Sequence, residues 1–288
     1  MLQTEQRLAA HRSPRMSLST CGVSRYIAPI TATEAINVIV TVSNNKGGVG
    51  KTALAAHLVF RAAEQGRVLA IDLDSQSNLS ATLIARIDKH GRASSDALFT
   101  EIDLPQPMHT ADASIDLLPA AAGLTGVDRQ NLSSGFSAMG HIKALAKQYD
   151  VVVIDTPPAL GLRLMTALAC ADRVLVPLVP ESYSVDGVAT VLSEIASIGE
   201  NLNPAMRPAD FVINLMNPQA KQHRRIAEQI AGNFKVAEPW LSRSVAVADA
   251  LAERRPVWRK VTSRNAATQW RSLCETLLRD YGVLPALD

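Results

Sequence analysis

The sequence of 288 residues predicts an α/β fold in which one doubly wound, mainly parallel sheet is flanked by helices. Short runs rich in β-branched residues, such as residues 37–42 and 68–73, alternate with longer stretches whose apolar residues recur at helical spacing. The composition is 47% hydrophobic but only 4% aromatic, which indicates an aliphatic core of the kind that helices build over a parallel sheet. Because no linker-like segment divides residues 36–288, we expect a single domain there.

Residues 1–35 lie outside this pattern. They show no sustained periodicity and are rich in Ser, Thr and Arg, so we expect an N-terminal extension that is flexible. The three cysteines, Cys21, Cys170 and Cys274, have no metal-like spacing and fit free thiols in a reducing cytoplasm. No apolar run approaches the roughly 18 to 20 residues of a membrane span, so we expect a cytoplasmic protein without a membrane partner.

The stretch around which the domain is organised follows its first predicted strand. Residues 43–52 read Ser-Asn-Asn-Lys-Gly-Gly-Val-Gly-Lys-Thr and precede an amphipathic helix. Such a loop exposes unpaired N–H groups and the positive end of a helix dipole, which attract an anion, and its glycines let the backbone curl around a phosphate. Lys51 is expected on the β and γ phosphates of a nucleotide and the Thr52 hydroxyl on Mg²⁺. The candidate nucleotide-binding residues are Lys46, Gly47, Gly48, Val49, Gly50, Lys51, Thr52 and Ala53.

The loop departs from the ordinary phosphate-loop pattern. Asn45 stands where that pattern has glycine, and a second lysine, Lys46, follows it. Residues 46–52 resemble the deviant Walker A box of ParA-type ATPases. The resemblance implies a P-loop NTPase of the deviant Walker A class that uses ATP and Mg²⁺. It also implies that Lys46 reaches across a nucleotide-sandwich homodimer to the partner's phosphates, and that Lys46 and Lys51 are catalytic.

The second predicted strand ends in a pair of carboxylates. Residues 72–78 read Asp-Leu-Asp-Ser-Gln-Ser-Asn and are similar to the ParA segment Asp-Leu-Asp-Pro-Gln-Gly-Asn. The resemblance implies that Asp74 is catalytic and orients the attacking water, and that Asp72 lies nearer the Mg²⁺ shell. Ser75 and Ser77 replace the family's Pro and Gly, and Ala53 replaces a second Thr, which leaves the hydrolysis rate open.

A later strand is predicted to supply a further metal ligand, Asp155. Residues 88–113 are polar and show no sustained periodicity, so we expect a connecting segment that carries a short edge element. Residues 114–119 resemble a short strand. A helix is predicted for about residues 128–148. The apolar run that follows ends at Asp155, a Walker B arrangement in which a carboxylate at the strand tip holds Mg²⁺ through water. Thr156-Pro-Pro158 then matches the family's second switch segment.

Further strands are predicted for residues 171–180 and 211–217, and a last helix for residues 270–278. Ligands collect at the carboxyl ends of parallel strands, so Asn214 or Asn217 is a candidate for a hydrogen bond to the adenine. An ordinary strand-end cap explains these asparagines equally well. The family resemblance adds Pro256, in a loop near the base.

The net charge of +2 hides an uneven distribution. Residues 219–265 hold ten Lys and Arg against four acids, a local charge of +6 on an otherwise slightly acidic chain, which suggests a polyanion-binding surface. Arg243 occupies the place of an arginine that ParA proteins use for sequence-independent DNA contact. The bland alternative is a solvated face. The candidate DNA-binding residues are Arg243, Arg254, Arg255, Arg259, Lys260 and Arg264.

Together with these patterns, the resemblance to ParA-type ATPases implies a slow Mg-ATPase that dimerises with ATP, binds nonspecific DNA and acts in partition of a plasmid, integrating element or chromosome. The resemblance also implies a centromere-binding or other activating adaptor protein as partner. A weakly or non-hydrolysing adaptor for another cargo is the main alternative. A MinD-like membrane ATPase fits less well, because residues 279–288 contain Gly282 and Pro285 and little positive charge. A small-molecule ligase on the same fold lacks an obvious substrate constellation.

Overall fold

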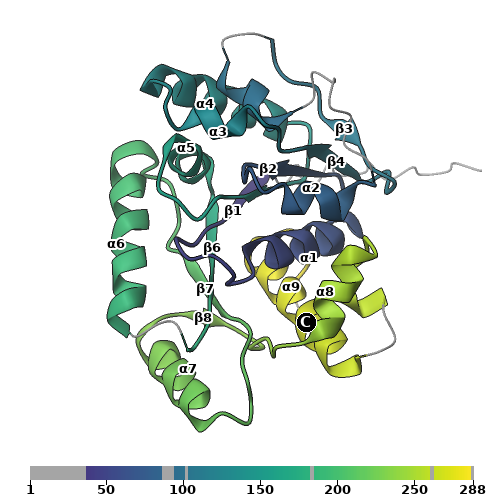
Figure 1. Cartoon of the computed structure of the whole chain (residues 1–288), viewed down its shortest axis with the longest axis vertical. Helices are drawn as coiled ribbons and strands as arrows, with labels where there is room; N and C mark the ends of the chain where they lie inside the picture. The colour runs from purple at the N-terminus through teal and green to yellow at the C-terminus, as the bar shows by residue number, and fades with distance from the viewer. Residues whose placement is uncertain (1–36, 86–93, 101–102, 182–184, 260–262, 287–288) are drawn as a thin grey trace, which may run out of the picture. The chain divides into compact units, whose positions relative to one another are not determined.

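The computed structural model describes residues 37–85, 94–100, 103–181, 185–259 and 263–286, and the predicted N-terminal extension lies outside them. Within these residues, eight strands form one sheet (Figure 1). The strands are β1 (Val38–Val42), β2 (Val68–Asp72), β3 (Met108–His109), β4 (Ile115–Leu118), β5 (Val151–Asp155), β6 (Arg173–Leu178), β7 (Asp210–Ile213) and β8 (Val236–Ala237).

The helices lie between the strands along most of the chain, and the last two of them follow β8. They are α1 (Lys51–Ala63), α2 (Asn78–Leu83), α3 (Leu124–Val127), α4 (Leu132–Ala146), α5 (Leu162–Cys170), α6 (Val185–Leu202), α7 (Lys221–Asn233), α8 (Val245–Ala252) and α9 (Arg264–Asp280), with 3₁₀ turns η1 (Ser95–Phe99) and η2 (Val257–Arg259). None of the helices in the described part of the chain has the length and apolar character that a membrane crossing requires.

The strand order is β3-β4-β2-β5-β1-β6-β7-β8, and every neighbouring pair is parallel except β3 with β4. The predicted doubly wound, mainly parallel sheet is therefore confirmed. Its register aligns the carboxyl ends of the central strands, because Asp155 at the end of β5 lies opposite Val42 on β1 and Asp72 on β2. The loops after these three strands consequently open at one edge of the sheet, where α/β proteins bind ligands.

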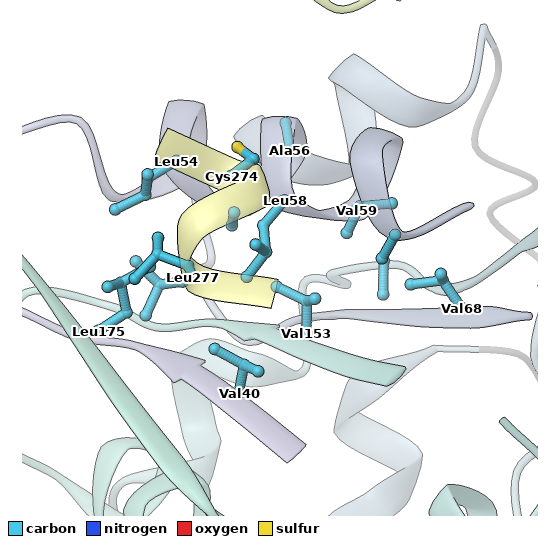
Figure 2. Packing of buried hydrophobic residues seen from close by; sticks show 14 of the residues in the cluster. Val40, Leu54, Ala56, Leu58, Val59, Val68, Val153, Leu175, Cys274 and Leu277 are labelled. Atoms are coloured by element: carbon cyan, nitrogen blue, oxygen red, sulfur yellow. The ribbon is translucent and has the colours of Figure 1, made fainter. Parts of the chain in front are cut away.

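Helices cover both faces of the sheet. Alternate residues of β1 point to opposite faces, so Val40 packs with α1 and α9 while Ile39 packs with α4. Figure 1 shows α1, α8 and α9 gathered on one side of the sheet. In Figure 2, Leu58 from α1 and Leu277 from α9 reach the same layer of valines on the strands. This packing fixes α1, and with it the loop that precedes α1, against the centre of the sheet.

The predicted helix over residues 128–148 is wrong in its first part. The structure has α3 and α4 instead, separated by a break at residues 128–131. Asn131 caps α4 by accepting a hydrogen bond from the Ser134 N–H, and this capping begins a new helix. The excursion between β2 and β4 does hold a short edge strand, β3, which is antiparallel to β4.

Candidate nucleotide-binding site

The loop between β1 and α1 is held in shape by an asparagine near its beginning. Asn44 is buried, and its Nδ2 donates to the Pro177 carbonyl of β6 at 2.7 Å while its Oδ1 accepts from the Lys46 N–H at 2.8 Å. Gly50 adopts a φ of 93°, and a Cβ there would lie 2.2 Å from Nδ2 of Asn214. Only glycine fits this position, both for its backbone conformation and for its space.

The two lysines of this loop lie in different environments. The Lys51 side chain is buried, and its Nζ donates to the Lys46 carbonyl at 3.0 Å. Burial lowers the pKa of Lys51, and the charges of Asp155 and Asp74 oppose this shift. The Lys46 residue, in contrast, is exposed. One lysine therefore points into its own loop, and the other stands at the surface of the loop.

Thr52 and Asp155 form a pair that suits a magnesium ion. The Thr52 hydroxyl donates to Oδ2 of Asp155 at 2.6 Å, while the buried Oδ1 of Asp155 has no hydrogen-bond partner among the described residues. Burial and the neighbouring charge of Asp72 raise the pKa of Asp155, so a cation beside it would favour the charged form. A hydroxyl and a carboxylate oxygen are ligands that Mg²⁺ prefers, with further oxygens supplied by phosphates and water.

Asp72 is engaged differently. Its Oδ2 accepts from the N–H and the hydroxyl of Ser80, at 2.9 and 2.6 Å, and its Oδ1 accepts from the Asp74 N–H at 3.1 Å. Both oxygens are thus used to shape the turn after β2. These contacts give Asp72 a role in loop structure, and its predicted place near the metal stays a prediction. Its main partner is Ser80, which the sequence pattern did not single out.

Asp74 lies in the turn that Asp72 holds. It is partly buried, its Oδ1 accepts from the Gln76 N–H at 3.0 Å, and its charge acts on both Lys51 and Asp155. Asp74 therefore belongs to the same site as the loop lysine and the strand-tip carboxylate. Ser77 has a left-handed φ of 58°, so the chain keeps at this position a backbone conformation that glycine adopts without strain.

The predicted base contacts are less well placed. Asn214 is buried under the loop, where its Nδ2 donates to the Val49 carbonyl at 2.8 Å. Asn217 is exposed and caps the turn before α7 through the Gln219 N–H. Pro256 lines a hollow with Phe60 of α1 and Arg254, and no phosphate-loop residue lines that hollow within the described chain. The predicted contact of Pro256 with the base stays a prediction.

The candidate DNA-binding arginines do not form one cluster. The Arg243 side chain is 63% exposed and contacts Glu181 at 3.0 Å. Arg254 and Arg255 follow α8, at its other end, and Arg255 pairs with Glu253. Arg259 and Arg264 are also exposed, and Lys260 lies outside the described residues. The structure thus places Arg243 before α8, and Arg254 and Arg255 after it.

Comparisons with known proteins identify relatives of this chain. The model of a family described as an AAA domain matches residues 37–207. The chromosome partitioning protein ParA of Myxococcus xanthus is 30% identical over 76% of this chain and 80% of its own. Protein IncC of Escherichia coli is 34% identical over 85% and 70% of the two chains. The cobyrinic acid a,c-diamide synthase of Mycobacterium smegmatis, solved with an ATP analogue and magnesium, aligns with a TM-score of 0.70 at 25% identity, covering 87% of this chain and 99% of its own.

Proposed function

The chain belongs to the ParA-type family of partition ATPases, and we propose that it is an ATP-dependent dimerisation switch that acts in DNA partition. ATP and Mg²⁺ are its cofactors. The cargo is a plasmid, an integrating element or a chromosome. Hydrolysis is slow and is stimulated by a centromere-binding or other adaptor protein, and between cycles the protein resides on the nucleoid in the cytoplasm.

The observation that supports the switch best is the contrast between the two loop lysines. Lys51 is buried and bonded within its own loop, whereas Lys46 is exposed on the loop surface. A lysine at the surface of this loop is suited to the phosphates of a nucleotide held by a second copy. The γ-phosphate then biases the monomer–dimer equilibrium, because only the dimer supplies both lysines to it.

Hydrolysis needs a positioned water and a way to neutralise the phosphate charge. When bound, Mg²⁺ would stabilise that charge, held by the Thr52 hydroxyl and by Asp155 through water. Lys51 binds the phosphates, and Asp74 orients the water. Arg243 and the basic residues after α8 contribute nonspecific, salt-dependent contacts to DNA, and dimerisation doubles their number.

The test is nucleotide-dependent retention on arbitrary DNA, measured by surface binding for wild type, Lys46→Ala and Asp74→Ala. We expect retention of wild type with ATP and Mg²⁺ but not with ADP. Lys46→Ala abolishes retention because the dimer is lost, and Asp74→Ala prolongs it because hydrolysis becomes much slower. Retention that is indifferent to nucleotide in all three proteins would contradict the switch. Retention with ATP but without measurable turnover of wild type would favour the weakly hydrolysing adaptor.

A further inference from the structure

Arg163 is a buried cation that the proposed mechanism leaves unused. It lies in the first turn of α5, directly after the segment 156–161 that follows Asp155, and it is 7% exposed. Its Nε and Nη2 donate to Oδ2 of Asp128 at 3.0 and 2.6 Å, and its backbone N–H donates to Oδ1 at 3.1 Å. Burial alone would raise the pKa of Asp128, but the hydrogen bonds and charge of Arg163 outweigh it and lower that pKa.

The remaining nitrogen of the guanidinium reaches the segment that follows β2. Nη1 of Arg163 donates to the Leu73 carbonyl at 2.9 Å. That carbonyl belongs to the peptide unit between Leu73 and Asp74, whose N–H donates to Oδ1 of Asp72 at 3.1 Å. The same peptide unit is therefore held at both of its polar ends. Leu73 is fixed further, because its own N–H donates to the Asp155 carbonyl at 2.9 Å.

The orientation of a peptide unit sets the direction of the side chain that follows it, and here that side chain is Asp74. We propose that Arg163 is a positioning residue for hydrolysis: it clamps the peptide before Asp74 and thereby aims the Asp74 carboxylate at the attacking water. This inference rests on the proposed role of Asp74. The planar fork of arginine suits the task, since it bonds a carboxylate along one edge and still offers a nitrogen to a carbonyl.

The arrangement also links three segments of the site. Asp128 lies between α3 and α4, Arg163 begins α5, and Leu73 follows β2. Asp128 anchors the arginine, so that the Leu73 carbonyl accepts from a group with little freedom to move. Positioning of this kind affects turnover more than nucleotide binding, because the phosphate loop does not depend on the contact.

The experiment combines a double-mutant cycle with a matched control in the full-length protein. Arg163→Met keeps most of the apolar stem and removes the fork. We expect kcat of Mg-ATP hydrolysis to fall about 10-fold or more. KM and the affinity for a non-hydrolysable ATP analogue should change by less than about threefold. In the Asp74→Ala background the same substitution should lower kcat no further, because the group it positions is already gone.

Arg61→Met is the control. Arg61 is also 7% exposed and is paired with Glu275 at 3.1 Å, but it lies on α1 away from Asp74. The kcat of Arg61→Met shows how much turnover is lost when a buried, paired arginine is removed elsewhere in the protein. Amide hydrogen exchange at Leu73 and Asp74 gives a readout independent of turnover: exchange should accelerate in Arg163→Met and stay unchanged in Arg61→Met. If Arg163→Met does not fold, Arg163→Lys is measured by the same criteria.

The outcomes separate this inference from the proposed function. If Asp74→Ala hydrolyses ATP at the wild-type rate, the role of Asp74 fails and the inference fails with it. If Asp74→Ala is slow but Arg163→Met turns over normally, only the inference is overturned. It is also overturned if the two losses multiply in the double mutant, or if Arg61→Met lowers kcat as much as Arg163→Met does.

Discussion

His57 ties the phosphate-loop helix to the C-terminal part of the domain. It lies fully buried on α1, between Trp258 and Trp270, with ring centroids 5.4 and 4.4 Å away. Its Nε2 accepts from the Val257 N–H at 3.1 Å, so Nδ1 carries the proton and donates to the Ala53 carbonyl at 2.7 Å. Both ring nitrogens are used in the neutral form, and a second proton would break the bond to Val257.

This geometry predicts a pH dependence of stability. Burial lowers the pKa of His57 from 6.5 to about 4. Between these values the unfolded chain takes up a proton that the folded protein excludes, so the free energy of unfolding falls as the pH falls from 6.5 to 4. The loss approaches about 1.4 kcal/mol per pH unit. Urea unfolding of wild type and His57→Gln across this range checks it.

The glutamine variant isolates the histidine from other titrating groups. At pH 7 we expect His57→Gln to be less stable than wild type by roughly 1 to 3 kcal/mol, because a buried hydrogen bond is lost. The gap should narrow towards low pH, since only the wild type must exclude that proton. Parallel stability curves for the two proteins would contradict a neutral, buried His57.

At the scale of elements, Arg254 at the end of α8 lowers the stability of the fold while it adds a positive charge to the candidate DNA-binding residues. The Arg254 N–H donates to the Leu251 carbonyl and the Arg255 N–H to the Ala250 carbonyl, the pattern of a Schellman motif. Arg254 therefore occupies the position after the helix that usually holds glycine, and its φ is 55°. A residue other than glycine in this left-handed backbone conformation lowers the stability by about 1 kcal/mol.

We predict that Arg254→Gly raises the free energy of unfolding, by up to about 1 kcal/mol, and weakens retention on DNA. The glycine relieves the backbone strain, while the lost charge removes one candidate phosphate contact. Arg254→Ala is the matched control, because it removes the same charge and keeps the strain. Thermal unfolding and DNA retention of the three proteins provide the measurement. Equal DNA retention in all of them would remove Arg254 from the DNA-binding surface.

The elements differ in how far the sequence could predict them. The strands that end in Val42, Asp72 and Asp155 were predictable because buried parallel strands are continuously apolar, and polar residues stand at their ends or directly after them. The break before α4 was not recognised. Asn131 is a local capping signal within an apparently helical stretch, but Asp128 turns towards Arg163, 35 residues away. A contact between residues so far apart in the sequence depends on the order of the strands in the sheet, and the spacing of apolar residues does not reveal that order.

At the scale of the whole molecule, the same limit applies to the site. The loop residues are contiguous and could be predicted as a set, and the pairing of Thr52 with Asp155 follows once β1 and β5 are neighbours. The support of the loop by Asn44 and Asn214 could not be predicted, because it comes from β6 and β7 on the other side of β1. The register of the sheet thus brings together, at one site, segments that lie far apart in the sequence.

The whole-molecule prediction concerns the salt dependence of DNA binding. Each phosphate neutralised contributes about 0.9 to the slope of log affinity against log salt concentration. If the ATP state is a dimer, one arginine per chain counts twice, so Arg243→Ala should lower the slope by about 1.8 rather than 0.9.

Arg67→Ala is the control, because it removes the same charge. The Arg67 side chain is 58% exposed, but it directly precedes β2 and so lies at the opposite edge of the sheet. Retention measured over a range of salt concentrations with ATP should therefore give a reduced slope for Arg243→Ala and the wild-type slope for Arg67→Ala. A reduction of the same size in both variants would mean that DNA responds to net charge alone, and that the carboxyl edge of the sheet is not the face it contacts.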